Sequence, residues 1–155
     1  MASASESDFD VNYWNQKVND SIFLGRGALG DVYGPIVWHD KRCALKKISF
    51  IDDKQEEFRK EIENNKQRWL SLEHKNLITV HRVHLQPRAL YVVMEFAAGL
   101  SLDQVLLKHG SQLKLMTDTV TDWAKQLADG MAYLHERNIV HRDLKSANSK
   151  YYVHM

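Results

Sequence analysis

Three glycines interrupt a stretch of strand-forming residues and limit the backbone conformations available to it. Gly25, Gly27 and Gly30 stand between the apolar run 22–24 and the run that begins at Val32. Glycine permits close backbone approach and positive φ angles, so the cluster predicts a tight turn between two strands. Because a strand and not a helix is expected after Gly30, the pattern favours a hairpin that covers phosphates over a dinucleotide-binding helix. An ordinary glycine-rich turn is the alternative interpretation.

The rest of the chain predicts a strand-rich region followed by helices. The expected strands are 21–24, 32–33 with 36–38, 43–48, 77–85 and 90–96. The expected helices are 53–72, 102–108 after an N-cap at Ser101, and 120–136 with a wide apolar stripe. Pro35 cannot donate to a strand ladder, so an edge or a bulge is expected there. This order of elements predicts an α+β fold with a small strand-rich lobe and the start of a helical lobe.

Composition excludes several classes of function. Lys plus Arg number 21 against 20 Asp plus Glu, a net charge of +1 that gives no field to attract nucleic acid or an anionic membrane. Cys43 is the only cysteine, which rules out an internal disulfide and a cysteine zinc site. No apolar run reaches the roughly 18 residues of a spanning helix, and the N-terminal residues do not resemble a secretory signal. We therefore expect a cytoplasmic protein without nucleic-acid or membrane partners.

A lysine on the expected third strand is a candidate phosphate ligand. Side chains alternate along a strand, so Ala44 and Lys46 point to one face and Lys47 to the other. A small residue beside a lysine lets a flat base and a phosphate lie against the same strand face. The alternative is a surface lysine in a charged strand.

The most specific motif follows the expected helix 120–136. It is His141-Arg142-Asp143-Leu144-Lys145-Ser146-Ala147-Asn148. This string resembles the catalytic loop of the protein kinases, H-R-D-L-x-x-x-N. With the glycine cluster and the strand lysine in the family's order, residues 21–148 are identified as part of a protein kinase. His141 and Arg142 would then have structural roles.

The resemblance implies a domain layout. Residues 21–96 would form a complete N-terminal lobe, a five-stranded antiparallel sheet with one helix. Residues 97–148 would hold the hinge and part of the C-terminal lobe, ending at the catalytic loop. Residues 1–20 would be a partly disordered extension, and 149–155 would be a tail outside the family pattern.

The resemblance also implies the catalytic roles, with ATP and Mg²⁺ as cofactors. Asp143 would accept the proton of the substrate hydroxyl, and Asn148 would bind the magnesium ion. Lys145, typical of the Ser/Thr kinases, would steady the γ-phosphate. Lys46 would pair with the α- and β-phosphates.

The remaining nucleotide contacts are implied by position in the family pattern. Met94 would be the gatekeeper residue behind adenine. The backbone of Glu95 and Ala97 would form hydrogen bonds with the base, and Asp103 would bind the ribose. The glycine hairpin would cover the phosphates, and three apolar residues would form the upper wall of the adenine slot: Leu24, Val32 and Ala44. The full implied set is Leu24, Gly25, Gly27, Gly30, Val32, Ala44, Lys46, Met94, Glu95, Ala97 and Asp103.

Active kinases also need a glutamate on the helix after the lysine strand to hold that lysine. Two local patterns give different candidates for this position. Glu61 is indicated by the string Phe58-Arg59-Lys60-Glu61, which resembles the family pattern. Asn65 is indicated by counting back from His74-Lys75-Asn76-Leu77. The two positions are one helical turn apart and share a face. We favour Glu61, and one more solvated charge is the alternative.

The strings Met94-Glu-Phe-Ala, Leu134-His-Glu-Arg and His141-Arg-Asp-Leu-Lys-Ser resemble the mixed-lineage and related kinases of mitogen-activated cascades. That resemblance implies a protein substrate such as a downstream MAP kinase kinase. After Asn148 the sequence contains no D-F-G and no A-P-E. We therefore expect a shortened kinase that is inactive on its own.

Two alternatives remain. One is a non-catalytic fragment, a regulatory or dominant-negative isoform that binds nucleotide or binds a partner through the apolar face of 120–136. The other is an unstable fragment without a function of its own.

Overall fold

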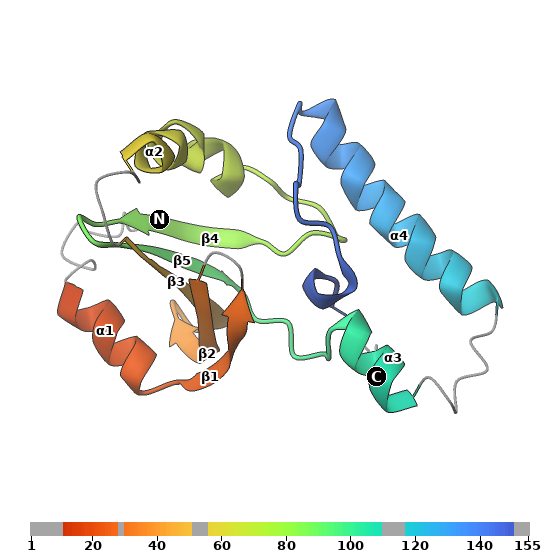
Figure 1. Ribbon diagram of the computed structural model, residues 1–155, viewed down its shortest axis with the longest axis horizontal. Coiled ribbons are helices and arrows are strands. Elements are labelled where there is room, and N and C mark those ends of the chain that lie inside the picture. The colour runs from red at the N-terminus through yellow and green to blue at the C-terminus, as the bar shows by residue number, and fades with distance from the viewer. Residues whose placement is uncertain (1–10, 28–29, 51–55, 110–116, 151–155) are drawn as a thin grey trace. The chain divides into compact units, whose positions relative to one another are not determined.

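The computed structural model describes residues 11–27, 30–50, 56–109 and 117–150, which form two compact units (Figure 1). The first unit extends to Leu72 and resumes at Thr79–Phe96. The second unit contains Glu73–Ile78 and the residues that follow Phe96. Of the extension 1–20, predicted to be partly disordered, residues 1–10 lie outside the described residues, as do residues 151–155 of the predicted tail 149–155.

The first unit is built on one antiparallel sheet of five strands in the order β1-β2-β3-β5-β4. The strands are β1 (Ile22–Gly27), β2 (Gly30–Trp38), β3 (Lys41–Ser49), β4 (Val80–Leu85) and β5 (Ala89–Glu95). The predicted α+β fold and its five-stranded antiparallel sheet are confirmed. The fourth strand starts at Val80 and not at 77, since 77 and 78 belong to the second unit.

Pro35 lies within β2, which has a neighbour on each side. The pairing of β2 with β3 shifts between Tyr33 and Ile36, so Pro35 occupies a bulge, and its side chain is exposed. A bulge releases the ladder bond that proline cannot donate. The predicted bulge is therefore confirmed in an interior strand.

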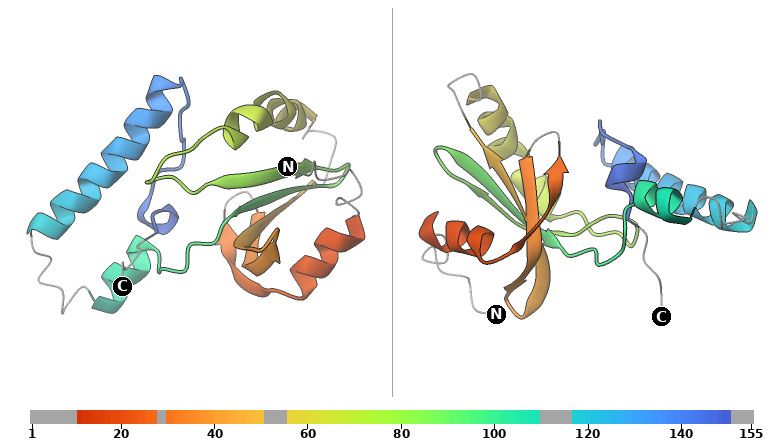
Figure 2. Two further views of the ribbon diagram at one scale, coloured as in Figure 1. Left: turned by 180° about the vertical axis from the view of Figure 1, so that it is seen from behind. Right: turned by 60° about the horizontal axis from the view of Figure 1, so that its bottom comes forward.

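Two helices cover opposite faces of this sheet, as Figures 1 and 2 show. Helix α1 (Val11–Asn19) lies on one face and α2 (Glu56–Leu70) on the other. Strand alternation sorts the core into two clusters. The cluster at α1 is Trp14, Ile36, Cys43, Leu45, Ala89, Tyr91 and Val93. The cluster at α2 is Ile48, Ile62, Val83 and Leu90.

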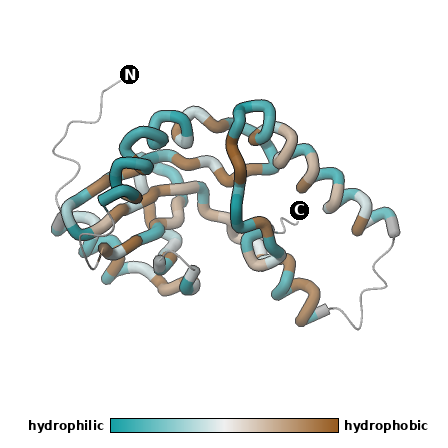
Figure 3. The backbone as a smooth tube through the Cα atoms, turned by 45° about the horizontal axis from the view of Figure 1, so that its top comes forward, coloured by the Kyte–Doolittle hydropathy of each residue, from teal (hydrophilic) through white to brown (hydrophobic). Residues whose placement is uncertain are grey.

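The second unit contains α3 (Leu102–His109), α4 (Thr117–Glu136) and a 3-10 turn, η3 (Ser146–Asn148). The apolar stripe of α4 is unevenly covered: Leu134 is 4% exposed, whereas Val120 near the other end is 44% exposed. In Figure 3 this helix alternates between hydrophobic and hydrophilic colours along its length. No helix in the described part of the chain is long and apolar enough to cross a bilayer.

Residues 73–78 join the second unit by binding α4. The hydroxyl of Tyr133 accepts a hydrogen bond from the Glu73 amide at 3.1 Å, and Asp129 accepts one from the Asn76 side chain at 3.0 Å. A Cβ built on Gly130 would lie 3.3 Å from the Asn76 carbonyl oxygen. A small residue at 130 therefore lets this segment lie close against the helix.

Candidate functional site

The glycine hairpin is formed by the end of β1 and the start of β2, where Gly27 pairs with Gly30. A Cβ built on Gly30 would stand 2.3 Å from the Lys47 carbonyl oxygen and 2.9 Å from Ile48 Cγ1. Because no side chain fits in that space, the hairpin lies directly against the backbone of β3. The predicted turn between two strands is present, and residues 28–29 at its tip lie outside the described residues.

An ion pair closes this hairpin just before its tip. Arg26 Nε donates to Asp31 Oδ1 at 2.7 Å, and Nη2 donates to Oδ2 at 3.2 Å. The hydrogen bond with Arg26 lowers the pKa of Asp31, and the same bond raises the pKa of Arg26. The sequence contained a signal for this pair, since opposite charges stand symmetrically about the turn, but the pair was not predicted.

Four predicted nucleotide contacts share one face of the sheet. Val32 is the cross-strand partner of Lys46, and Ala44 is the partner of Met94. Directly paired residues point to the same side of a sheet, and positions 44 and 46 alternate onto that side together. Ala44 is buried in this face, at 6% exposed. The structure thus brings these four residues together.

Leu24 lies at an irregularity in β1, where the register with β2 shifts between Phe23 and Gly25. A Cβ built on Gly34 would come within 3.3 Å of Leu24 Cδ1 and 3.4 Å of the Ala44 Cα. Gly34 therefore keeps the space between Leu24 and Ala44 free of a side chain. This role was not predicted, because it depends on the bulge at Pro35.

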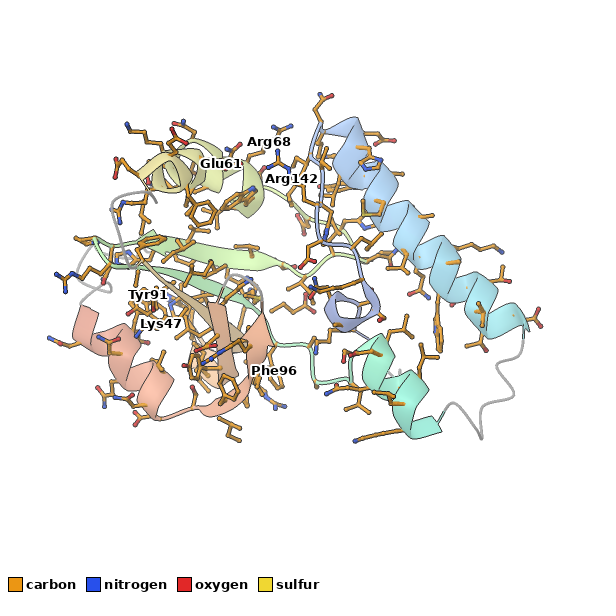
Figure 4. The ribbon with its side chains drawn as sticks, viewed as in Figure 1. Lys47, Glu61, Arg68, Tyr91, Phe96 and Arg142 are labelled. Carbon is orange, nitrogen blue, oxygen red and sulfur yellow. The ribbon has the colours of Figure 1, made fainter. Side chains whose placement is uncertain are left out.

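The predicted hinge begins at the end of β5. The Glu95 amide donates a hydrogen bond to the Thr79 carbonyl at 2.9 Å. The carbonyl oxygen of Glu95 is therefore the backbone group that would accept a hydrogen bond from a base. The Arg42 guanidinium lies 5.1 Å from the centre of the Phe96 ring, which Figure 4 labels. Ala97 and Asp103 belong to the second unit.

Both candidates for the lysine-binding position lie on α2. Ile62 is fully buried against the sheet, whereas the neighbouring Glu61 is exposed. The Asn65 side-chain amide donates to the Glu61 carbonyl at 2.7 Å, a bond within its own helix. An amide already bound in this way is a weaker candidate partner for a lysine than a carboxylate, so Glu61 remains the favoured prediction.

The catalytic-loop motif folds into a compact cluster in the second unit. Lys145 Nζ lies 2.9 Å from Asp143 Oδ1. The Asn148 side-chain amide donates at 2.8 Å to Asp143 Oδ2 and at 2.8 Å to the Asp143 carbonyl. The turn η3 brings Asn148 back toward Asp143. Three residues predicted from the motif are therefore in direct contact.

Asp143 is held in its charged form. The hydrogen bonds from Lys145 and then from Asn148 lower its pKa. The Asp143 amide donates to His141 Nδ1 at 3.3 Å, and Arg142 has a positive φ of 62°. The loop thus presents an ionised carboxylate with one donor on each oxygen, which is suited to orienting a hydroxyl group.

The cluster fits a magnesium ion through a single ligand. The Asn148 nitrogen is committed to Asp143, so the amide oxygen is the atom with which Asn148 would bind a hard cation. Among the described residues no group of three His, Cys, Asp or Glu is arranged to hold a metal. Mg²⁺ commonly keeps several waters and phosphate oxygens with one or two protein ligands. These residues therefore fit a metal that arrives with a phosphorylated ligand.

Asp103 lies in the first turn of α3. A hydrogen bond with Ser101 lowers the pKa of Asp103. The Ser101 amide donates to the Gln104 side chain at 3.0 Å, and its carbonyl accepts from Val105. These bonds place Ser101 at the N-terminus of the helix, as predicted, and fix the orientation of the first turn.

Comparisons with known proteins agree on one family. Residues 18–149 match the family described as "Protein kinase domain". The chain is 34% identical over 129 residues to mitogen-activated protein kinase kinase kinase 3 of Arabidopsis thaliana, a match that covers 81% of this chain and 21% of the relative. It is 35% identical over 138 residues to mitogen-activated protein kinase kinase kinase 10 of Xenopus laevis, covering 85% and 13%. The chain thus spans about a fifth of these relatives or less.

A solved structure shares the fold. The crystal structure of Rad53 1-466 in complex with AMP-PNP superposes with a TM-score of 0.70 at 25% identity. The match covers 83% of this chain and 33% of that one.

Proposed function

This chain belongs to the protein kinase family, and on that premise we propose that it is part of a Ser/Thr kinase that uses magnesium ATP. Its relatives include Ser/Thr kinases and mitogen-activated protein kinase kinase kinases. The observation that carries the proposal is the contact of Asp143 with Lys145 and Asn148 on one short loop. The shared face of Val32, Ala44, Lys46 and Met94 supports it independently.

Asp143 is the proposed proton acceptor. As the substrate hydroxyl oxygen bonds to the γ-phosphorus, the bond from that phosphorus to the β,γ-bridging oxygen breaks and ADP leaves. The proton of the hydroxyl passes to a carboxylate oxygen of Asp143. An acceptor with a lowered pKa is ionised at neutral pH, so its first task is to orient the hydroxyl. Phosphoryl transfer through a loose transition state depends mainly on such positioning and on charge neutralisation. Lys145 supplies a positive charge beside the acceptor.

The proposed nucleotide contacts are those that the family pattern implies. Lys46 would bind the α- and β-phosphates under the backbone of the glycine hairpin, formed by Gly25, Gly27 and Gly30. Adenine would contact Leu24, Val32, Ala44 and Met94, with backbone bonds from Glu95 and Ala97, and Asp103 would bind the ribose. Glu61 is proposed to hold Lys46. The AMP-PNP bound by the structural neighbour supports an ATP ligand.

Asn148 is the proposed metal ligand. When bound, Mg²⁺ neutralises phosphate charge. The chain's own contribution is to fix the amide plane of Asn148 through its two bonds to Asp143, at 2.8 Å each.

The finer assignments extend the family resemblance and the composition of the sequence. We propose a cytoplasmic protein whose substrate is a protein hydroxyl, with a downstream MAP kinase kinase as the first candidate. The proposed kinase lobes are 21–96 and 97–148. The extension 1–20 contributes α1, which packs on the sheet of the first lobe, and 149–155 lie outside the family pattern.

We further propose that a polypeptide of these 155 residues transfers phosphate poorly by itself. It contains Asn148 but no aspartate of a D-F-G motif after it. The alternative function is a non-catalytic, nucleotide- or partner-binding kinase fragment. The exposed end of the α4 stripe at Val120 and the 84% exposed Leu107 favour association with a partner.

Nucleotide binding is tested by calorimetric titration of the full 155-residue chain with magnesium ATP. Lys46→Met is expected to weaken binding more than tenfold, because charge-assisted bonds to phosphate are among the stronger hydrogen bonds. Lys41→Ala, which removes an exposed lysine from the same strand, is the matched control and should bind normally. Equal affinities for wild type and Lys46→Met would contradict the proposed site.

Transfer is tested separately with radiolabelled ATP and a generic protein substrate. We expect no signal above that of Asp143→Ala. Incorporation that Asp143→Ala abolishes, and that the α4 surface variant Asp122→Ala retains, would show that the 155 residues are catalytically active.

A further inference from the structure

Helix α1, which precedes the strands, is anchored on the sheet face opposite α2. Trp14 is fully buried among residues of β2, β3 and β5. Its ring stacks on Tyr91, with centroids 6.3 Å apart and an interplanar angle of 26°. Burial of a Trp side chain is among the larger apolar contributions that one residue makes. The helix is therefore part of the core of this unit.

The residue after Trp14 ties the helix to two strands at once. Asn15 Oδ1 accepts hydrogen bonds from Lys47 Nζ at 3.1 Å and from the Tyr91 hydroxyl at 3.0 Å. Lys47 and Tyr91 are direct cross-strand partners in β3 and β5, and Nζ lies 5.7 Å from the centre of the Tyr91 ring. Figure 4 shows the two labelled side chains next to each other above α1. One amide oxygen thus bridges a helix and a strand pair.

Lys47 lies between helix α1 and two parts of the nucleotide site, namely Lys46 and the glycine hairpin. It adjoins Lys46, whose side chain points to the other face of β3. Its carbonyl oxygen is the atom that would clash at 2.3 Å with a Cβ on Gly30. The Lys47 backbone therefore packs against the glycine hairpin, while its side chain is held by Asn15.

The connection from α1 to the hairpin strand is short and ordered. Only residues 20 and 21 separate α1 from β1. The Asp20 amide donates to the Gln16 carbonyl at 2.8 Å, and the Ser21 hydroxyl donates to the Val18 carbonyl at 3.1 Å. A displacement of α1 would therefore be transmitted to β1 as well as to β3.

We propose that Asn15 is a positioning residue for the phosphate anchor: by fixing the Lys47–Tyr91 pair from behind, it holds β3 against the glycine hairpin so that Lys46 can bind a triphosphate. This inference rests on the proposed nucleotide site. It predicts an effect confined to the phosphate part of the ligand, since adenosine makes no contact with Lys46.

The test compares the affinities of the full chain for magnesium ATP and for adenosine, measured by calorimetry at a temperature where circular dichroism shows each variant folded. Asn15→Leu is expected to lower the ATP-to-adenosine affinity ratio about three- to tenfold, the size of one net hydrogen bond lost. Asn15→Asp keeps an acceptor for both donors and should preserve the ratio. A merely structural role for Asn15 would lower the melting temperature and leave the ratio unchanged.

Further variants serve as a control and as substitutes if Asn15→Leu does not fold. Asn19→Leu, on the exposed end of the same helix, is the matched control and should leave the ratio unchanged. Tyr91→Phe and Lys47→Met each remove one donor to Asn15, and they decide the question if Asn15→Leu does not fold. In a Lys46→Met background, Asn15→Leu should produce no further change in the ratio.

The outcomes separate the two proposals. If wild type binds ATP no better than adenosine, the proposed phosphate anchor is wrong, and this inference falls with it. If the preference for ATP is lost in Lys46→Met but kept in Asn15→Leu, Tyr91→Phe and Lys47→Met, the nucleotide site stands and the role of Asn15 is refuted.

Discussion

The strand-rich unit and the helical unit hold their functional residues by different means. The largest fully buried side chains are Trp14, Tyr91, Leu45, Ile62, Leu90, Val93 and Cys43, all in the strand-rich unit. In the described part of the helical unit, the buried apolar side chains are Val105 and Leu134. Lys46 is thus supported by a packed core, whereas Asp143, Lys145 and Asn148 are all exposed and held by bonds to one another.

The motif around Asp143 keeps its local geometry although few buried apolar side chains lie in the described part of its unit. The bonds around Asp143 join residues at most five positions apart, so little chain must be ordered to form them. The strand face depends instead on pairing between residues far apart in sequence. Damage to the core should therefore affect the strand face more than the loop around Asp143.

The largest effect is expected from Trp14→Ala. The removed side chain is fully buried, so the free energy of unfolding should fall by about 3–5 kcal/mol, the usual range for buried Trp or Phe. Tyr13→Ala, on the exposed side of α1, should cost less than about 1 kcal/mol. Urea unfolding followed by circular dichroism measures both. Equal losses of stability in the two variants would mean that Trp14 is no more buried in solution than Tyr13.

Leu134→Ala should cause the second largest loss of stability, because Leu134 is the buried end of the apolar stripe of α4. A loss of about 2–4 kcal/mol is expected if the site does not collapse. Val120→Ala removes a half-exposed residue from the same helix and should cost well under half of that. Hydrogen exchange of the α4 amides provides the measurement, and a larger effect at Val120 would show that the stripe is covered in solution.

Gly30→Ala is expected to strain the hairpin by about 1–3 kcal/mol, a common cost of overpacking. The added methyl would meet the Lys47 carbonyl oxygen at 2.3 Å. Gly27→Ala is the control, since a Cβ built there would lie 3.5 Å from the Gly30 carbonyl oxygen, an ordinary van der Waals contact. Chemical shifts of β3 amides should move in the first variant and not in the second.

The smallest effect concerns pH. Because bonds from Lys145 and Asn148 lower the pKa of Asp143 in the folded loop, the loop is stabilised above the unfolded pKa of Asp143. That stabilisation is lost as the pH falls through the lowered, folded-state pKa. Lys145→Met should raise the pKa toward its ordinary value, as a carboxyl carbon NMR titration would show. An unchanged midpoint would mean that the ion pair does not form in solution.

Local pattern made much of the fold predictable. The five strands, the bulge at Pro35 and the N-cap at Ser101 follow from residue preferences within a few positions. The motif at 141–148 indicated Asp143, Lys145 and Asn148 as candidate residues, whereas the hydrogen bonds between Asp143 and Asn148 were not predicted.

What could not be predicted depends on contacts distant in sequence. The space that Gly34 keeps beside Leu24, and the acceptor role of Asn15, appear only once the strands are paired. The choice between Glu61 and Asn65 stayed open because positions one turn apart share a helix face. The helix expected from 120 begins at Thr117, since side-chain periodicity does not define the first turn.

The binding of residues 73–78 to α4 also bears on biosynthesis. Asn76 and its partner Asp129 are 53 positions apart, and Glu73 and Tyr133 are 60 apart. At elongation rates of about 5–20 residues per second, this segment leaves the ribosome seconds before the helix that will receive it. During that interval the nascent β4–β5 hairpin can close first. Helix α4 would then dock on residues 73–78 after the β4–β5 hairpin has formed.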